Sequence, residues 1–260
     1  MTLPDAPHVL VTGASGAIGG AIARELRARL PRARLSLVDV ARGASDELAG
    51  ELGGEVGVHA CDLARLDALP PLVAEVEQAR GPVDGLVNCA GFMEIRQLRG
   101  MDWQLGERLL RVDLLAPLRL QQACLGGMLE RASGFVINVT SMAGRVPIKG
   151  CAYYGAAKAG LAMASEVARA ELGPRGIRVV TVYPGPVRSA LERGARAQFG
   201  QSVLAARIPT GSPRQLARRV IDAVERGRAR VVYPDVYRIG FRALGLASRI
   251  TLGLGPEPLS

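Results

Sequence analysis

A tyrosine and a lysine four residues apart, Tyr154 and Lys158, could form an acid/base pair. On a helix, residues at this spacing lie on one face about a turn apart, so the ammonium of Lys158 can sit near the phenol of Tyr154 and favour its phenolate form. Ser141 follows the apolar run 135–139, which we interpret as a buried strand. Because open α/β sheets place their chemistry at strand ends, the serine can reach the pair from another element.

The composition is typical of a globular protein. The chain has 260 residues, 48% of them hydrophobic, which allows one large domain or two small ones. We recognise no signal peptide at the start and no apolar run as long as the roughly 18 residues of a spanning helix. We therefore expect a cytoplasmic protein, with peripheral membrane binding as the alternative.

Charge and cysteine content exclude several classes of partner. The net charge of +9 is spread along the chain and lacks aromatic interleaving or a recognition module, so we expect no nucleic-acid binding. The only lysines are Lys149 and Lys158. The four cysteines lie far apart without a CxxC motif, and only two histidines could join them, so we expect reduced thiols and no metal site.

The order of the elements predicts an α/β fold. Short apolar runs alternate with longer amphipathic runs, which is typical of βαβ units in a parallel sheet. We predict a single Rossmann-like, doubly wound domain over residues 1–260, with about seven parallel strands and helices on both faces. The expected strands are 8–12, 35–39, 56–60, 85–88, 134–140, 177–183 and 229–233. The expected helices begin near residues 17, 45, 66, 102, 152 and 213, and the segment 187–210 breaks the alternation as an irregular substrate loop.

A glycine-rich turn follows the first strand and opens a helix, which is the context of a dinucleotide-binding turn. Glycines let backbone N–H groups approach a pyrophosphate, whose charge the helix N-terminus favours. The residues of this turn that we expect to bind the cofactor are Thr12, Gly13, Ser15, Gly16, Ala17, Ile18 and Gly19. Asp39 ends the second strand, where a carboxylate can accept hydrogen bonds from ribose hydroxyls. It would repel a 2′-phosphate, so we expect the protein to prefer NAD(H) over NADP(H). NADP(H) is the alternative, because Arg42 lies close by in the sequence.

Taken together, these motifs resemble the short-chain dehydrogenase/reductase family, in its short single-domain branch. The resemblance covers roughly residues 8–190. In the glycine turn, the family's middle glycine falls on Ala17, while Gly16 supplies a small residue one place earlier. The resemblance implies further cofactor contacts, which fall on Asp62, Leu63, Asn88, Ala90, Gly91, Pro184, Gly185, Val187 and Ser189. The run 88–91 has a cysteine, Cys89, where the family has a second asparagine.

The catalytic residues that the resemblance implies are Ser141, Tyr154 and Lys158, with Tyr154 and Lys158 also contacting the cofactor. Tyr153 is excluded because it lies five residues from Lys158 and points off the shared face. The family completes this set with an asparagine, at the position of Asp113 here. An ionised aspartate cannot donate a hydrogen bond and adds a charge that can pair with Lys158. Two interpretations stay open, a shifted or reduced activity and a tolerated substitution.

The resemblance implies hydride transfer between a nicotinamide cofactor and an alcohol or ketone. The rival interpretation is a cofactor-binding regulatory or scaffold protein of the same fold. Apolar side chains on the expected site loops favour a hydrophobic substrate, and they are Phe92, Met93, Met142, Val187 and Leu191. The resemblance also implies a homo-dimer or homo-tetramer, paired through helices near 102–127 and 152–172.

The C-terminal segment 235–252 is amphipathic. On a helical wheel Arg238, Arg242 and Arg249 form a basic stripe. Such a stripe could contact an anionic membrane surface, or the helix could pack its apolar side on its own domain or a second subunit.

Overall fold

One parallel sheet organises the chain. The computed structural model describes residues 4–199, 209–255 and 258. The seven-stranded sheet has the order β3-β2-β1-β4-β5-β6-β7. Its strands are β1 (His8–Thr12), β2 (Arg34–Asp39), β3 (Val56–Ala60), β4 (Gly85–Asn88), β5 (Gly134–Val139), β6 (Ile177–Pro184) and β7 (Arg230–Tyr233). Every neighbouring pair is parallel, which confirms the predicted fold class.

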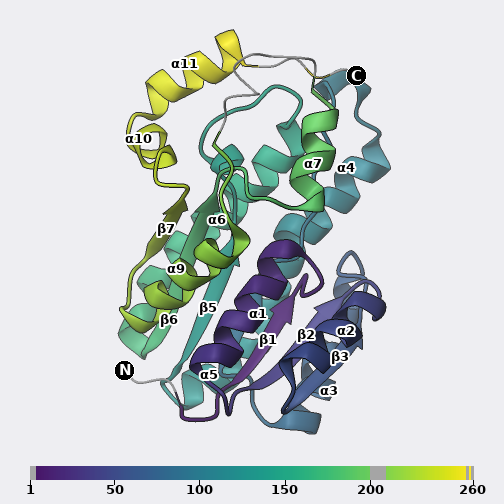
Figure 1. The fold of residues 1–260 in the computed structure, drawn as a ribbon, viewed down its shortest axis with the longest axis vertical. Helices are drawn as coiled ribbons and strands as arrows, with labels where there is room; N and C mark the ends of the chain where they lie inside the picture. Colours follow the sequence, from purple (N-terminus) through teal and green to yellow (C-terminus); the bar gives the residue numbers. More distant parts are fainter. Residues whose placement is uncertain (1–3, 200–208, 256–257, 259–260) are drawn as a thin grey trace.

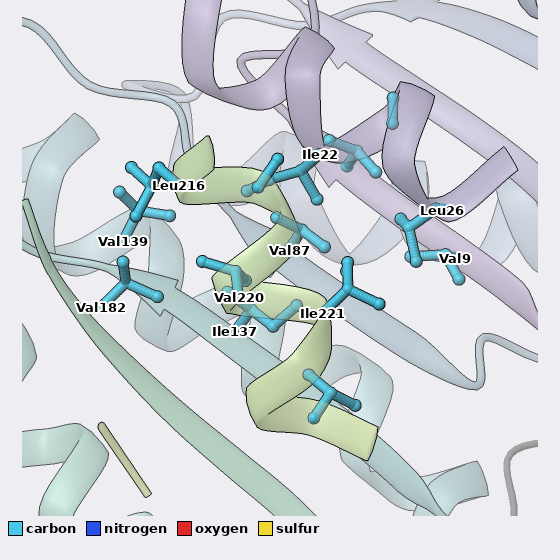
Figure 2. Close-up of a cluster of buried hydrophobic side chains, with 14 of the residues drawn as sticks. Val9, Ile22, Leu26, Val87, Ile137, Val139, Val182, Leu216, Val220 and Ile221 are labelled. Atoms are coloured by element: carbon cyan, nitrogen blue, oxygen red, sulfur yellow. The ribbon is translucent and has the colours of Figure 1, made fainter. Parts of the chain in front are cut away.

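Helices cover both faces of this sheet, so its central strands are buried on both sides and read as continuous apolar runs (Figure 1). On one face lie α1 (Ala17–Arg29), α2 (Gly43–Leu52) and α9 (Pro213–Glu225). Figure 2 shows Leu216, Val220 and Ile221 of α9 meeting Ile22 and Leu26 of α1 above the strands. The opposite face carries α3 (Leu69–Arg80), α5 (Ala116–Glu130) and α6 (Ala152–Leu172), which enclose a second apolar cluster.

The order of the strands reverses between β1 and β4. The chain runs outward from β1 to β3 and then returns to place β4 beside β1. In open α/β sheets, ligands bind in the crevice that this reversal leaves at the carboxyl ends of the strands. The strand ends that we expect to carry the site therefore share one edge of the sheet.

The predicted helix near 102–127 contains an irregular turn. It begins as α4 (Trp103–Leu110), capped by the Asp102 carboxylate, and continues into α5 through the π-helical turn η3 (Arg111–Leu115). π-helical turns are rare in proteins, and those that occur often lie at functional sites. Asp113 lies in this turn and is completely buried.

The other boundaries differ from the prediction by a few residues. The helix expected from Leu66 opens as the 3₁₀ turn η1 (Leu66–Ala68), and α3 begins at Leu69 because its two prolines fit only a first helical turn. Further short turns are η2 (Leu98–Gly100), η4 (Met142–Gly144) and η5 (Gly173–Arg175).

The segment 187–210, predicted to be irregular, contains a helix. This helix, α7 (Ala190–Ala197), begins where the Ser189 hydroxyl accepts a hydrogen bond from the Glu192 backbone N–H at 3.0 Å. Serine is a favoured residue at this position because it satisfies one of the unpaired amides of the first turn. Residues 200–208 of the expected substrate loop lie outside the described residues.

The C-terminal segment forms two helices, so the prediction of one continuous amphipathic helix over 235–252 was wrong. Helix α10 (Tyr237–Arg242) ends at Ala243, whose φ of −106° and ψ of 57° interrupt the helix before α11 (Leu244–Leu254). The Phe241 ring packs edge-on against Tyr183 at 4.9 Å between centroids. Tyr237, Phe241, Leu244 and Ala247 thus pack on their own domain, while Ile239, Ile250 and Leu252 are exposed, and the membrane contact stays a prediction. Within the described residues, the helices are too short or too polar to cross a bilayer.

Candidate active site

Ser141, Tyr154 and Lys158 come together at the carboxyl edge of the sheet. Ser141 follows β5, while Tyr154 and Lys158 lie near the start of α6 with their side chains buried. The Ser141 hydroxyl accepts a hydrogen bond from the Ala143 N–H at 3.1 Å. It also lies close enough to the Tyr154 phenol to act on its pKa. A reacting oxygen beside these two hydroxyl groups could be hydrogen-bonded by both.

Lys158 is held from two other elements. Its ammonium donates to the Val139 carbonyl of β5 at 3.3 Å and lies 3.0 Å from the Asp113 carboxylate. It stands 5.8 Å from the centroid of the Tyr154 ring. Burial works against the charge of Lys158, but the Asp113 carboxylate raises the pKa of the ammonium above its ordinary value. Lys158 is therefore a cation at neutral pH.

Asp113 uses both of its carboxylate oxygens. Oδ2 meets the Lys158 ammonium, and Oδ1 accepts a hydrogen bond from the Phe92 N–H at 3.0 Å. Burial raises the pKa of the Asp113 carboxyl group, while Lys158 and the Phe92 N–H oppose that change. The neighbouring Gly91 leaves room for the pair, since a Cβ there would lie 2.6 Å from Asp113 Oδ2 and 3.1 Å from Lys158 Nζ.

The surroundings of Tyr154 raise the pKa of its phenol rather than lower it. Burial raises its pKa above the ordinary value, and the nearby Asp113 carboxylate adds to that effect. Lys158 and the Ser141 hydroxyl oppose the rise without cancelling it. At neutral pH Tyr154 is therefore a neutral phenol that can give up a proton.

The glycine-rich turn lies beside this group, between β1 and α1. Gly13 has a φ of +65°, and a Cβ on it would lie 2.7 Å from the Ala90 backbone. Gly19 has still less room, because its Cβ would lie 2.1 Å from the Gly13 carbonyl oxygen. Gly16 precedes the first turn of α1, which contains no acidic residue. A backbone this closely approached, at the N-terminus of a helix whose first turn has no acidic residue, fits a pyrophosphate.

Thr12 ties the turn to the neighbouring strand. Its hydroxyl accepts from the backbone N–H groups of Cys89 and Ala90 at 3.1 and 3.2 Å and donates to the Val87 carbonyl at 3.3 Å. These bonds join the ends of β1 and β4 at the point where the strand order reverses. Ala17 and Ile18 form the first turn of α1 above them.

Asp39 closes the far side of the turn. Its carboxylate accepts hydrogen bonds from the Ser15 N–H at 3.0 Å, from the Ser15 hydroxyl at 2.5 Å and from the Val40 N–H at 2.8 Å. Arg42, the residue that could bind the 2′-phosphate of NADP(H), pairs with Asp46 of α2 at 3.2 Å. A cavity of about 240 Å³ adjoins Ser15 and is lined by Ala14, Ser15, Gly20, Arg24, Ala44, Glu47, Leu48 and Glu51.

Asp62 and Leu63 differ in their surroundings. Leu63 is buried in the apolar cluster of the α3 face. Asp62 accepts from the Ala64 N–H at 3.0 Å and forms a bidentate ion pair with Arg108 of α4 at 3.0 and 3.1 Å. The Ala64 N–H and this guanidinium hold the pKa of the Asp62 carboxyl group below its ordinary value. Sequence reasoning missed Arg108, since no local pattern connects residues 46 positions apart.

Asn88 belongs to a buried amide network that sequence reasoning also missed. Its Nδ2 donates to Asn138 Oδ1 at 2.8 Å, and Asn138 in turn donates to Ser165 Oγ at 2.8 Å and to Gln121 Oε1 at 3.3 Å. The signal was present, because Asn138 interrupts an otherwise apolar strand. This network fixes the spacing of β4, β5 and α6 behind the site.

The turn after β6 brings the last predicted residues to the same edge. Pro184 ends β6, the Gly185 N–H donates to the Tyr233 carbonyl at 2.8 Å, and Val187 pairs with Gly211. Ser189 caps α7 through its hydroxyl. The described residues contain no group of three or more histidine, cysteine or acidic side chains arranged to hold a metal ion.

This combination defines the class of the protein. A turn that fits a pyrophosphate, beside a serine, a tyrosine and a lysine at the switch point of a parallel sheet, is the arrangement of a Rossmann-like nicotinamide-dependent oxidoreductase.

Comparison with known proteins gives the family. Residues 7–199 match the family described as short chain dehydrogenase. A D-threitol dehydrogenase from Mycolicibacterium smegmatis is 33% identical over 210 residues, which cover 80% of each protein. A short-chain dehydrogenase structure from Streptomyces avermitilis superimposes with a TM-score of 0.82 at 26% identity, covering 96% of each chain. Another from Sphingobium yanoikuyae, solved in complex with NADPH, has a TM-score of 0.79 at 27% identity and covers 95% of each chain.

The chain therefore belongs to the short-chain dehydrogenase family. It is an NAD(P)-dependent oxidoreductase that acts on an alcohol or carbonyl group, as the relatives of this family do.

The glycine turn gives a test of cofactor binding. We expect Gly19→Ala to weaken NADH binding at least tenfold, because its Cβ would displace the Gly13 carbonyl and with it the phosphate-facing amides. Fluorescence titration with NADH measures this. Gly50→Ala on α2, where a Cβ meets nothing within 4 Å, is the matched control and should bind normally. Equal binding by both variants would contradict this assignment of the turn.

Proposed function

We propose that Tyr154 is the general acid or base of this oxidoreductase and exchanges one proton with the substrate oxygen. Ser141 hydrogen-bonds the same oxygen and stabilises charge as it develops there. Lys158 lies beside the phenol as a cation paired with Asp113, and it contacts the cofactor ribose. The single observation that carries the proposal is the position of the buried Tyr154 phenol, which lies near the Ser141 hydroxyl and has the Lys158 ammonium 5.8 Å from its ring centroid.

The bound nicotinamide supplies or accepts the hydride, and the chain has to hold it and manage the proton. In this proposal the glycine turn, residues 12–19, binds the pyrophosphate. Asp39 holds the adenosine ribose, while Asp62 and Leu63 border the adenine. Asn88, Ala90 and Gly91 line the floor of the site. The backbone of 184–187 and Ser189 border the carboxamide.

We propose NAD(H) as the preferred cofactor. Asp39 is fixed by Ser15 at the position for the ribose, and Glu47 lines the adjoining cavity, where Glu51 is paired with Arg24. Carboxylates at this place disfavour the 2′-phosphate of NADP(H). Arg42, which could have compensated, is paired with Asp46. The alternative is NADP(H), since the relative from Sphingobium yanoikuyae was solved in complex with NADPH.

A hydrophobic alcohol or ketone is the proposed substrate. Phe92 and Met93 pack beside Tyr154, and Leu191 of α7 is 40% exposed. Met142 and Val187 are buried in apolar clusters, so they contribute to the wall behind the site rather than its free surface. We propose that 187–210 is the substrate segment. Ala195 and Phe199 of that segment support this, because they pack against the loop that carries Met93 and Ile95.

A homo-oligomer is the proposed assembly, in keeping with the family. The apolar side chains of Leu115, Met163 and Val167 are exposed on η3 and α6, which pack against each other. An apolar patch of this kind on a helix pair is typical of a subunit interface.

The acid/base role of Tyr154 has a direct test. Tyr154→Phe removes the proton donor and should lower kcat by a factor of about 10²–10⁴, while the dissociation constant for NADH changes less than about twofold. Steady-state assays and NADH titration measure the two quantities. Tyr153→Phe is the matched control and should keep near-normal turnover. A fully active Tyr154→Phe variant would show that Tyr154 is not the general acid or base.

Cofactor choice can be tested at Asp39. We expect Asp39→Ala to raise the ratio of kcat/KM for NADPH over NADH at least tenfold, because it removes the charge that faces the 2′-phosphate. Asp67→Ala makes the same change in net charge at an exposed position of η1 and should leave the ratio unchanged. An unaltered ratio in Asp39→Ala would mean that other groups select the cofactor.

The proposed interface can be tested with a charge. Met163→Glu should lower the oligomer to a smaller species, since an unpaired carboxylate in an apolar interface is strongly unfavourable. Sedimentation velocity reports the mass. Val40→Glu, at an equally exposed apolar position beside β2, is the control. An oligomer that survives Met163→Glu would place the interface elsewhere.

A further inference from the structure

The ion pair between Asp113 and Lys158 lies next to the reacting group and is almost sealed from solvent. Asp113 has no exposed surface, and Lys158 has 4%. Each Asp113 oxygen faces a donor, the Phe92 N–H on one side and the Lys158 ammonium on the other. Oδ2 lies at ion-pair distance from the ammonium rather than in a well-aligned hydrogen bond, and an ammonium has only donors to offer it. The pair is therefore a carboxylate and an ammonium.

Seen from Tyr154, the Asp113 carboxylate offsets part of the Lys158 charge, since Lys158 lowers the pKa of the phenol and Asp113 raises it. An isolated ammonium 5.8 Å from the ring would favour the phenolate strongly in a buried site. With a carboxylate only 3.0 Å from that ammonium, the phenol experiences an ion pair rather than a single positive charge. The lysine keeps its hydrogen bonds, but its electrostatic effect on the phenol is weakened.

The remaining groups around the pair do not replace the lost positive charge. Cys151 faces Tyr154 from the start of α6, and Cys89 faces Lys158 from the end of β4. Burial raises the pKa of the Cys151 thiol to about 11 and that of Cys89 to about 12, so both are neutral. The Asp39 carboxyl group, which also acts on Cys89, brings no positive charge either. The Ser141 hydroxyl, which also acts on Tyr154, is uncharged.

We propose that Asp113 is a positioning residue that neutralises Lys158 and keeps Tyr154 as a neutral proton donor, so that at neutral pH the site is prepared to reduce a carbonyl rather than to oxidise an alcohol. This inference rests on the proposed role of Tyr154. Reduction consumes the phenol proton as the carbonyl carbon receives hydride from the reduced cofactor, and oxidation requires the phenolate to take the alcohol proton. A neutral tyrosine serves the first direction over the whole neutral range. The second direction becomes faster only as the pH rises toward the titration of the phenol.

The ionisation of Tyr154 can be measured without cofactor or substrate. Phenolate absorbs in the near ultraviolet, and subtracting a titration of the matching Tyr154→Phe protein isolates Tyr154 from the other tyrosines. We expect Asp113→Asn to form phenolate at least about one pH unit lower than the wild-type protein, because the ammonium then acts alone. Asp67→Asn is the control for net charge, and circular dichroism at each pH confirms that the protein stays folded.

A double variant separates charge from structure. Asp113→Asn combined with Lys158→Met removes both charges, so its Tyr154 should titrate within about half a pH unit of the wild-type phenol, well above Asp113→Asn alone. In turnover, Asp113→Asn should shift the pH profile of alcohol oxidation downward by the same interval as the phenol titration. Its rate of carbonyl reduction at neutral pH should not rise.

Two results would overturn the inference. Tyr154 could titrate at the same pH in Asp113→Asn and the wild-type protein, or the double variant could titrate together with Asp113→Asn. Either would mean that Asp113 does not neutralise Lys158. If the titrations follow the prediction but Tyr154→Phe turns over normally, the charge relation holds and the proposed function fails.

Discussion

The buried ammonium of Lys158 is the group on which the arrangement of the site depends. A charge in this position is costly unless it is paired and hydrogen-bonded, and Lys158 has both kinds of partner, the Asp113 carboxylate and the Val139 carbonyl. Each partner comes from a different element, so the ammonium can be satisfied only when β5, η3 and α6 are all in place. Removing one partner alone would leave an uncompensated buried charge.

The elements around Lys158 are held by polar contacts as well as by the two apolar layers. The network of Asn88, Asn138, Gln121 and Ser165 joins β4, β5, α5 and α6 behind the site. Thr12 joins β1 to β4 in front of it. Buried polar groups of this kind are stabilising only when their hydrogen bonds are made, which restricts how the strands and helices can shift against each other. The glycine turn and the acid/base group are thus fixed in one frame.

Much of this frame could be predicted from the sequence because it depends on local patterns. The strands are short apolar runs, the turn at Gly13 requires a positive φ, and the spacing of Tyr154 and Lys158 follows from the helical period. Helix α6 begins at the predicted residue for the same reason.

What the sequence did not reveal depends on contacts between distant residues. Nothing near Asp113 indicates a π-helical turn, which positions its carboxylate against Lys158 from 45 residues away. The bidentate pair of Arg108 with Asp62 and the break of the C-terminal segment at Ala243 are of the same kind. The prediction that Asp113 can pair with Lys158 came from charge alone, and the consequence for Tyr154 needed the burial of all three side chains.

The central claim is that this site moves a hydride between the cofactor and a carbonyl carbon. The most direct test is to incubate the protein with NADH carrying two deuterium atoms at nicotinamide C4 and a panel of apolar ketones, and to examine the products by mass spectrometry. The claim predicts that at least one ketone becomes an alcohol with a single deuterium at the carbinol carbon. Tight binding of NADH with no labelled alcohol from any ketone, and none with NADPH labelled in the same way, would contradict it.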